Sequence, residues 1–231
     1  MKNAPGQDLV PNYGSALPKQ FKNRDFGLNE KLGIHKLFRM VLLGPSYSGK
    51  TNLVFHILKE SPHVYSHLHI IARNADQELY NYIKEKLEGF CTFYEPESPP
   101  SVDAIKKING LQLVIIDDYS NDKLVQKNLF SHFFTRGRHK LLSTIFISHS
   151  YFATDKMIRL NSEYVAILKA NSKRDLQMVL KDFNLPGIGE HDIFRAYKEA
   201  TSHKGQFLFI DSINQCLRTN FKGKIYSGDD N

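Results

Sequence analysis

The hydrophobic positions from residue 38 onward fall into two alternating patterns. One is a short run of consecutive apolar residues, typical of a strand buried on both faces; these runs are 39–43, 67–73, 90–94, 111–117, 143–148, 164–169 and 206–211. The other is a longer segment with apolar residues every three or four positions, which predicts an amphipathic helix; these segments are 50–60, 77–88, 121–135, 171–184 and 191–201. Strands without polar alternation, interleaved with such helices, predict an α/β domain with a mainly parallel sheet and helices on both faces.

The ends of the chain do not show these patterns. Residues 1–37 are rich in Pro, Gly, Asn and Lys and predict a flexible basic arm. We therefore expect one domain over 38–212 and a C-terminal tail over 213–231. The longest apolar runs have about seven residues, far fewer than the roughly 20 of a membrane helix, and the first residues lack the apolar core of a secretory signal. The widely separated Cys91 and Cys216 predict a reducing compartment.

A complete GxxxxGK[ST] motif lies between the strand 39–43 and the helix 50–60. Its residues, with the next helical residue, are Gly44, Pro45, Ser46, Tyr47, Ser48, Gly49, Lys50, Thr51 and Asn52. Glycines let the backbone wrap closely, so that its N–H groups and the helix N-terminus cradle phosphate oxygens. Lys50 then reaches the β- and γ-phosphates, and the Thr51 hydroxyl binds Mg²⁺. The motif predicts a site for ATP with Mg²⁺.

A nucleoside triphosphatase also needs carboxylates, and the strand 111–117 supplies them. The sequence Leu-Val-Ile-Ile-Asp-Asp places Asp117 at the carboxyl end of this strand, where α/β sheets bind their ligands. We expect Asp117 to hold Mg²⁺ through water and Asp118 to polarise the attacking water. Many related enzymes have Glu at the second position; Asp is one methylene shorter and needs the water closer.

Three further polar residues are candidates for catalysis. His149 follows the strand 143–148 and would sense the γ-phosphate if this strand neighbours the one that ends at Asp117; the alternative is an exposed histidine at a strand end. Arg136 and Arg138 precede the same strand. Either can act as an arginine finger in a neighbouring subunit, contact DNA phosphates, or cap a helix C-terminus.

Charge is unevenly distributed along the chain. The formal net charge is +7, with 31 Lys and Arg against 24 Asp and Glu. Positive charge gathers in 1–39 and 121–160, whereas 40–120 is net negative. These two basic blocks indicate an anionic partner, although solvated loops would give the same pattern. In the second block, Lys123, Lys127 and Lys140 are candidates for DNA contacts.

Three segments together resemble a known family: FRMVLLGPSYSGKT (38–51), LVIIDD (113–118) and TRGRHKLLSTIFISHSYF (135–152), with IRLNSEYVAIL (158–168) continuing the similarity. This pattern is similar to the viral genome-packaging ATPases of the FtsK–HerA superfamily, as found in poxviruses, giant viruses, virophages and polinton-like elements. The resemblance implies a RecA-like (additional-strand) P-loop core. It gives Lys50, Thr51, Asp117 and Asp118 the roles described above and favours an arginine that acts across a subunit interface. The family usually has Gln at the position of His149.

The resemblance also implies partners and a location. A ring of five or six copies would translocate double-stranded DNA into a capsid, in contact with capsid proteins and no membrane, in the cytoplasmic viral factories of the host or in the virion. Arg159 and Asn161 match a family element to which we assign no chemistry. Two alternatives remain open: a P-loop kinase of nucleosides or other small molecules, although 171–231 lacks the arginine cluster of a kinase lid, and a DNA-binding protein regulated by nucleotide.

Overall fold

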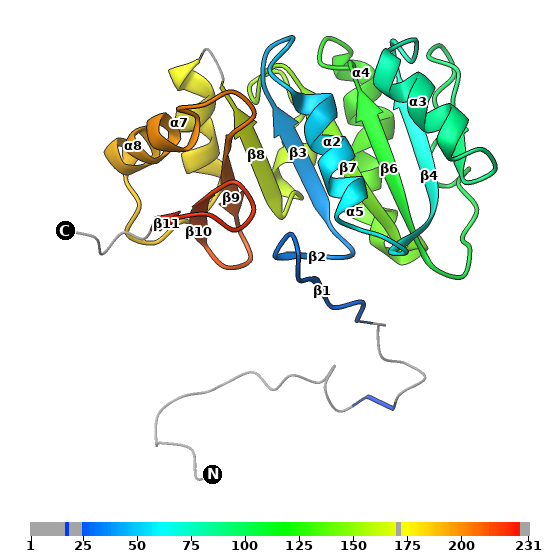
Figure 1. The fold of residues 1–231 in the computed structure, drawn as a ribbon, viewed down its shortest axis with the longest axis horizontal. Helices are drawn as coiled ribbons and strands as arrows, with labels where there is room; N and C mark the ends of the chain where they lie inside the picture. The colour runs from blue at the N-terminus through cyan, green and yellow to red at the C-terminus, as the bar shows by residue number, and fades with distance from the viewer. Residues whose placement is uncertain (1–16, 19–24, 170–171, 227–231) are drawn as a thin grey trace.

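The computed structural model describes residues 17–18, 25–169 and 172–226 (Figure 1). In this part of the chain the main sheet has nine strands in the order β11-β10-β9-β8-β3-β7-β6-β4-β5. Their bounds are β3 Arg39–Leu43, β4 Tyr65–Ala72, β5 Cys91–Phe93, β6 Leu111–Asp117, β7 Leu142–Ser148, β8 Tyr164–Leu168, β9 Phe207–Asp211, β10 Cys216–Thr219 and β11 Ile225–Tyr226. The strands from β8 to β5 are parallel, whereas β9, β10 and β11 continue the sheet antiparallel. The predicted mainly parallel α/β fold is confirmed.

Helices cover both faces of the sheet, as predicted. They are α2 Lys50–Lys59, α3 Glu78–Lys86, α4 Lys123–Val125, α5 Ser131–Arg136, α6 Lys156–Leu160, α7 Lys173–Asp182 and α8 Glu190–Ala200, with the π-helix η2 Gln126–Phe130 and the 3-10 turn η3 Gly137–Lys140 beside α5. In Figure 1, α2 and α3 lie in front of the sheet. The predicted helix 121–135 is therefore a helix with a π-helical middle, and α6 is an additional short helix.

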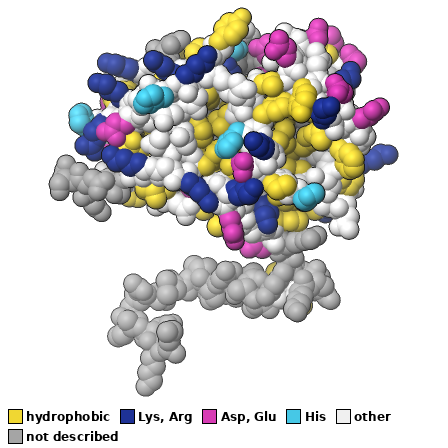
Figure 2. Space-filling view, in the orientation of Figure 1, with side chains coloured by type: hydrophobic (Ala, Val, Ile, Leu, Met, Phe, Trp, Pro, Cys, Tyr) yellow, Lys and Arg dark blue, Asp and Glu magenta, His cyan; other side chains and the backbone are white. Residues whose placement is uncertain are grey.

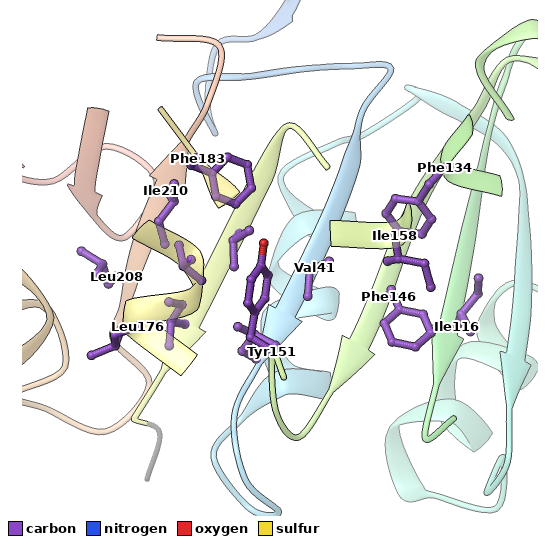
Figure 3. Close-up of a cluster of buried hydrophobic side chains, with 14 of the residues drawn as sticks. Val41, Ile116, Phe134, Phe146, Tyr151, Ile158, Leu176, Phe183, Leu208 and Ile210 are labelled. Atoms are coloured by element: carbon purple, nitrogen blue, oxygen red, sulfur yellow. The ribbon is translucent and has the colours of Figure 1, made fainter. Parts of the chain in front are cut away.

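Two hydrophobic clusters, one on each face, hold the layers together. Successive strand residues point to opposite faces, so Val41 belongs to one cluster and Leu42 to the other. The first cluster contains the buried side chains of α5, α7 and α8 and is shown around Tyr151 in Figure 3. The second contains those of α2 and α3. Both faces of the central strands are therefore buried, which explains why their sequences are continuous apolar runs.

The domain extends beyond its predicted bounds at both ends. The short strands β1 (Leu28–Asn29) and β2 (Ile34–His35) pair with each other, and Ile34 is buried in the second cluster. Strands β10 and β11 fall within the predicted tail. Strands of two to four residues are too short to produce a recognisable hydrophobic period, so the sequence pattern did not reveal them. Most of the predicted arm and the last five residues lie outside the described residues.

Candidate functional site

The carboxyl ends of three adjacent strands define the candidate site. β7 lies between β3 and β6 in the sheet, so the segments that follow β3, β6 and β7 meet at one edge. A cavity of about 730 Å³ lies there, hereafter the phosphate cavity. Its described lining comprises Ser46, Tyr47, Ser48, Gly49, Lys50, Thr51, Asn52, Asp76, Gln77, Glu78, Leu79, Asp117, Asp118, His149 and Lys204. Predicted motifs far apart in the sequence thus meet in one cavity.

The phosphate loop, Gly44–Thr51, depends on its two glycines. Gly49 has a φ of 100°, which disfavours any side chain, and it directly precedes α2. A Cβ at Gly44 would lie 2.4 Å from the Ser48 Oγ. Lys50 closes the loop: its Nζ donates hydrogen bonds to the carbonyl oxygens of Gly44 (2.7 Å) and Pro45 (2.8 Å). The loop is therefore formed by the chain itself, with Lys50 folded back over it.

Burial lowers the pKa of Lys50, and the carboxylates of Asp117 and Asp118 oppose this effect. The ammonium thus lies between a desolvating environment, which disfavours its charge, and two acidic groups, which favour it. A phosphate placed against the loop would add negative charge at this position. A bound phosphate would therefore favour the charged form of Lys50.

Asp117 is held in place by a tyrosine that the sequence analysis did not identify. It ends the fully buried strand β6, and its carboxylate accepts a hydrogen bond of 2.7 Å from the hydroxyl of Tyr80 on α3. Burial raises the pKa of Asp117, whereas the hydrogen bond from Tyr80 and the charge of Lys50 lower it. Tyr80 is itself completely buried. Its only sequence signal was its place on the apolar face of a predicted helix, which does not distinguish it from a core residue.

Asp118 and His149 meet at the rim of the cavity. The Asp118 Oδ1 lies 3.4 Å from the His149 Nε2, and both side chains are about half exposed. Asp118 has a φ of 63°, a left-handed conformation that turns the chain sharply after β6. The Ser120 hydroxyl accepts a hydrogen bond from the His149 backbone N–H at 3.3 Å and contacts the Ser148 hydroxyl at 3.1 Å. The loops after β6 and β7 are therefore tied together where the two side chains meet.

The structure places Arg136 and Arg138 away from this cavity. Both precede β7, at the opposite edge of the sheet from His149, and seven strand residues at about 3.3 Å each separate the two edges by roughly 20 Å. Arg136 forms an ion pair of 3.2 Å with Asp103. Arg138 lines a smaller cavity of about 260 Å³. Neither arginine can serve the phosphate site of its own chain.

Arg159 and Asn161 also lie apart from the cavity and have structural contacts. Arg159 forms an ion pair of 3.5 Å with Asp182, and its guanidinium lies over the ring of Tyr151 at 5.1 Å. Asn161 donates a hydrogen bond of 2.8 Å to the carbonyl oxygen of Met157. The Arg159 ion pair joins α6 to α7, and the Asn161 hydrogen bond lies at the end of α6. Structural contacts therefore account for both residues without a catalytic role.

The donor set fits Mg²⁺ that is held jointly with a nucleotide. Mg²⁺ in phosphate sites takes one or two protein ligands, with water and phosphate oxygens as the rest. Thr51 and Asp117 line the same cavity, and the charge of Lys50 acts on Asp117 directly. Within the described ranges, no cluster of three or more His, Cys, Asp or Glu side chains is arranged to hold a metal alone. The residues therefore suit a metal that arrives with phosphate.

Two of the lysines predicted to contact DNA donate hydrogen bonds to the chain's own carbonyl groups. Lys123 donates hydrogen bonds to the carbonyl oxygens of Phe152 and Ala153. Lys140 donates to those of Asp103 (2.8 Å) and Ile105 (2.9 Å). Their positive charges remain, but their side chains are fixed at the surface.

Comparison with known proteins gives a consistent fold. No protein-family model and no curated protein matches the sequence. Among solved structures, the genome packaging NTPase B204 from Sulfolobus turreted icosahedral virus 2 in complex with AMPPCP is similar with a TM-score of 0.60 and 18% identity, over 83% of this chain and 100% of that chain. The cytoplasmic domain of the Thermomonospora curvata type VII secretion ATPase EccC is similar with a TM-score of 0.55 and 12% identity, over 87% of this chain and 27% of that chain.

The pCW3 conjugation coupling protein TcpA, in a monomer form with ATPγS, has a TM-score of 0.53 and 12% identity, over 84% of this chain and 62% of that chain. At these identities the likeness establishes architecture. In the described residues, no helix combines the length and apolar character needed to cross a membrane. The chain has the α/β RecA-like fold of P-loop ATPases, and the structures it resembles include a viral genome-packaging NTPase.

Proposed function

We propose that this protein is an ATPase that drives double-stranded DNA into a viral capsid. The observation that carries the ATPase part is the convergence of Lys50, Thr51, Asp117, Asp118 and His149 on one cavity. The packaging part is supported by the quoted family motifs and by the fold similarity to a genome packaging NTPase, which covers 83% of this chain and 100% of that chain.

Hydrolysis follows from the positions of these side chains. The triphosphate lies against the loop N–H groups, and the Lys50 ammonium leaves the carbonyls of Gly44 and Pro45 for phosphate oxygens. Thr51 and Asp117 would hold Mg²⁺, which neutralises charge on the phosphates when bound. Asp118 accepts the hydrogen bond of the attacking water, and His149, next to it, donates to the γ-phosphate side.

A neighbouring subunit would complete the site with an arginine. Lys50 and Lys204 are the cationic side chains that line the cavity in the described part of the chain, and no arginine does. Among the described residues, the side chain of Arg138 has no hydrogen-bond or ion-pair partner, whereas that of Arg136 is paired with Asp103. Arg138 is therefore the better candidate to act in a neighbour, within a homo-oligomeric ring of five or six subunits.

DNA binding would rest on charge rather than on base recognition. The block 121–160 is basic, and contacts with phosphates give affinity that falls steeply with salt. Since Lys123 and Lys140 are held by carbonyl groups, Lys127 on η2 is the most available of the three predicted lysines.

The decisive test measures ATP hydrolysis at low salt with and without double-stranded DNA. We expect DNA to stimulate the wild-type protein and the Lys50→Ala variant to be inactive in both conditions. If a nucleoside acceptor stimulates ATP consumption and DNA does not, the kinase alternative replaces the proposal.

Mixing experiments test the arginine. We expect a Lys50→Ala subunit, which retains Arg138, to restore activity to an Arg138→Ala subunit, which retains its own phosphate loop. Absence of restoration, together with restoration of an Arg136→Ala subunit, would assign the role to Arg136.

A further inference from the structure

A second cavity, of about 650 Å³, lies beside the phosphate cavity and is hereafter the aromatic pocket. It lies between α2 and the turn that joins β10 to β11. Figure 2 shows the face of the molecule that carries α2. Leu53, Phe207 and Phe221 line it and are buried, whereas His56 is exposed at its side. The pocket thus has an apolar interior and an accessible aromatic wall.

The two cavities are continuous through the phosphate loop. Ser48, Gly49, Asn52 and Lys204 line both of them. The Ser48 Oγ, at this junction, is buried and has no hydrogen-bond partner.

The order of the groups fixes the direction of a bound nucleotide. Asp117, Asp118 and His149 line only the phosphate cavity, so the reacting γ-phosphate lies there. Asn52 and His56 lie one turn apart on α2, and both face the aromatic pocket. A triphosphate with its γ end toward Asp118 therefore directs its nucleoside end over Asn52 and toward His56.

The pocket has an aromatic wall, with His56 on its exposed side, on which a nucleobase can stack. The rings of His56 and Phe221 are stacked with centroids 6.0 Å apart and planes 24° apart. Phe221 also packs edge-on against Phe207 at 5.1 Å, which fixes its orientation. Bases stack on aromatic side chains regardless of their identity, because every base has a π-face.

Polar groups at the rim indicate which bases the pocket tolerates. Lys31, Lys204 and Lys222 line it, and the described lining includes no carboxylate. Lysine can donate to N7 of either purine and to O6 of guanine. The described lining therefore offers no carboxylate to select the N–H donors of guanine, and its lysines can donate to O6.

We infer that the aromatic pocket binds the purine base of the nucleoside triphosphate, with His56 as a stacking surface, and that it accepts guanine as well as adenine. This inference rests on the proposed function, because it needs the triphosphate to occupy the phosphate cavity.

The test compares binding of MgATP, MgGTP and magnesium triphosphate by calorimetry. The variants are His56→Ala and His56→Phe, with His191→Ala, an exposed histidine on α8, as the matched control. Alanine is the strongest helix former, so His56→Ala preserves α2. Stacking on one base is worth enough that its loss weakens binding by roughly tenfold.

We expect His56→Ala to bind MgATP and MgGTP about tenfold more weakly and triphosphate unchanged, and His56→Phe to bind all three like wild type. Unchanged purine nucleotide binding by His56→Ala, with triphosphate still bound, would overturn the inference and leave the proposed function standing. A wild-type protein that binds neither triphosphate nor nucleotide would remove both. A wild-type preference for ATP over GTP of more than about tenfold would overturn the stated base tolerance.

Discussion

Replacement of Tyr80 by phenylalanine removes a single hydroxyl, the one that donates to Asp117 at 2.7 Å. Both groups are buried, so water does not readily replace the lost donor. A hydrogen bond to a charged group contributes about 1.5–3 kcal/mol, which corresponds to roughly ten- to a hundredfold in a binding constant. Because the Tyr80 hydrogen bond lowers the pKa of Asp117, its loss raises that pKa and makes the carboxylate a poorer partner for Mg²⁺ as the pH falls.

We therefore expect Tyr80→Phe to weaken MgATP binding by about tenfold or more and to leave binding of ATP in excess EDTA unchanged. Calorimetry with and without Mg²⁺, between pH 5.5 and 8, measures both quantities. The matched control is Tyr82→Phe, because Tyr82 is an exposed tyrosine on the same helix. If Tyr80→Phe binds MgATP as tightly as Tyr82→Phe over the whole pH range, Asp117 is not the Mg²⁺ partner that we describe.

Three further predictions concern Asp118 and His149 in the site and His69 in the sheet. Asp118→Asn should lower kcat by at least about a hundredfold, the usual contribution of a general base, with MgATP affinity unchanged; a parallel loss of affinity would contradict its role. His149→Gln should retain hydrolysis, whereas His149→Ala should lose about tenfold, as measured by phosphate release. Burial lowers the pKa of His69, so the unfolded chain binds protons more readily. The free energy of unfolding should therefore fall as the pH drops below about 6.5, and urea titrations of His69→Gln should show a shallower dependence.

The sequence predicted the fold well where elements are long and periodic. The apolar runs that correspond to β3, β6 and β7 are buried in the structure, so the hydrophobic pattern alone identifies these strands. Prediction from the sequence failed where an element is short or where its pairing depends on residues that are distant in the sequence. Strands β10 and β11 pair antiparallel beside β9, and their few residues carry no period. The π-helix η2 also has no sequence signal of its own.

The candidate site was predictable only as far as its motif residues. Lys50 and Asp117 come from a spacing that local chemistry explains. Tyr80 and Gln126 were not identified, because their roles depend on which loops the fold brings near them. Gln126 is fully buried, and its amide donates to the carbonyl oxygens of Tyr119 (2.8 Å) and Ser120 (3.0 Å), directly after Asp118. From the sequence alone, a glutamine in a helical segment is expected at the surface.

Under the proposed function, strand β7 would join the nucleotide site of one subunit to the arginine offered to the next. Its carboxyl end leads to His149, beside Asp118 of the same chain, and its amino end follows Arg138 at the opposite edge of the sheet. The strand is buried along its whole length and pairs on both sides, so it behaves as a rigid element. Under the proposed function, the loop that faces one nucleotide and the arginine offered to the next are two ends of one strand.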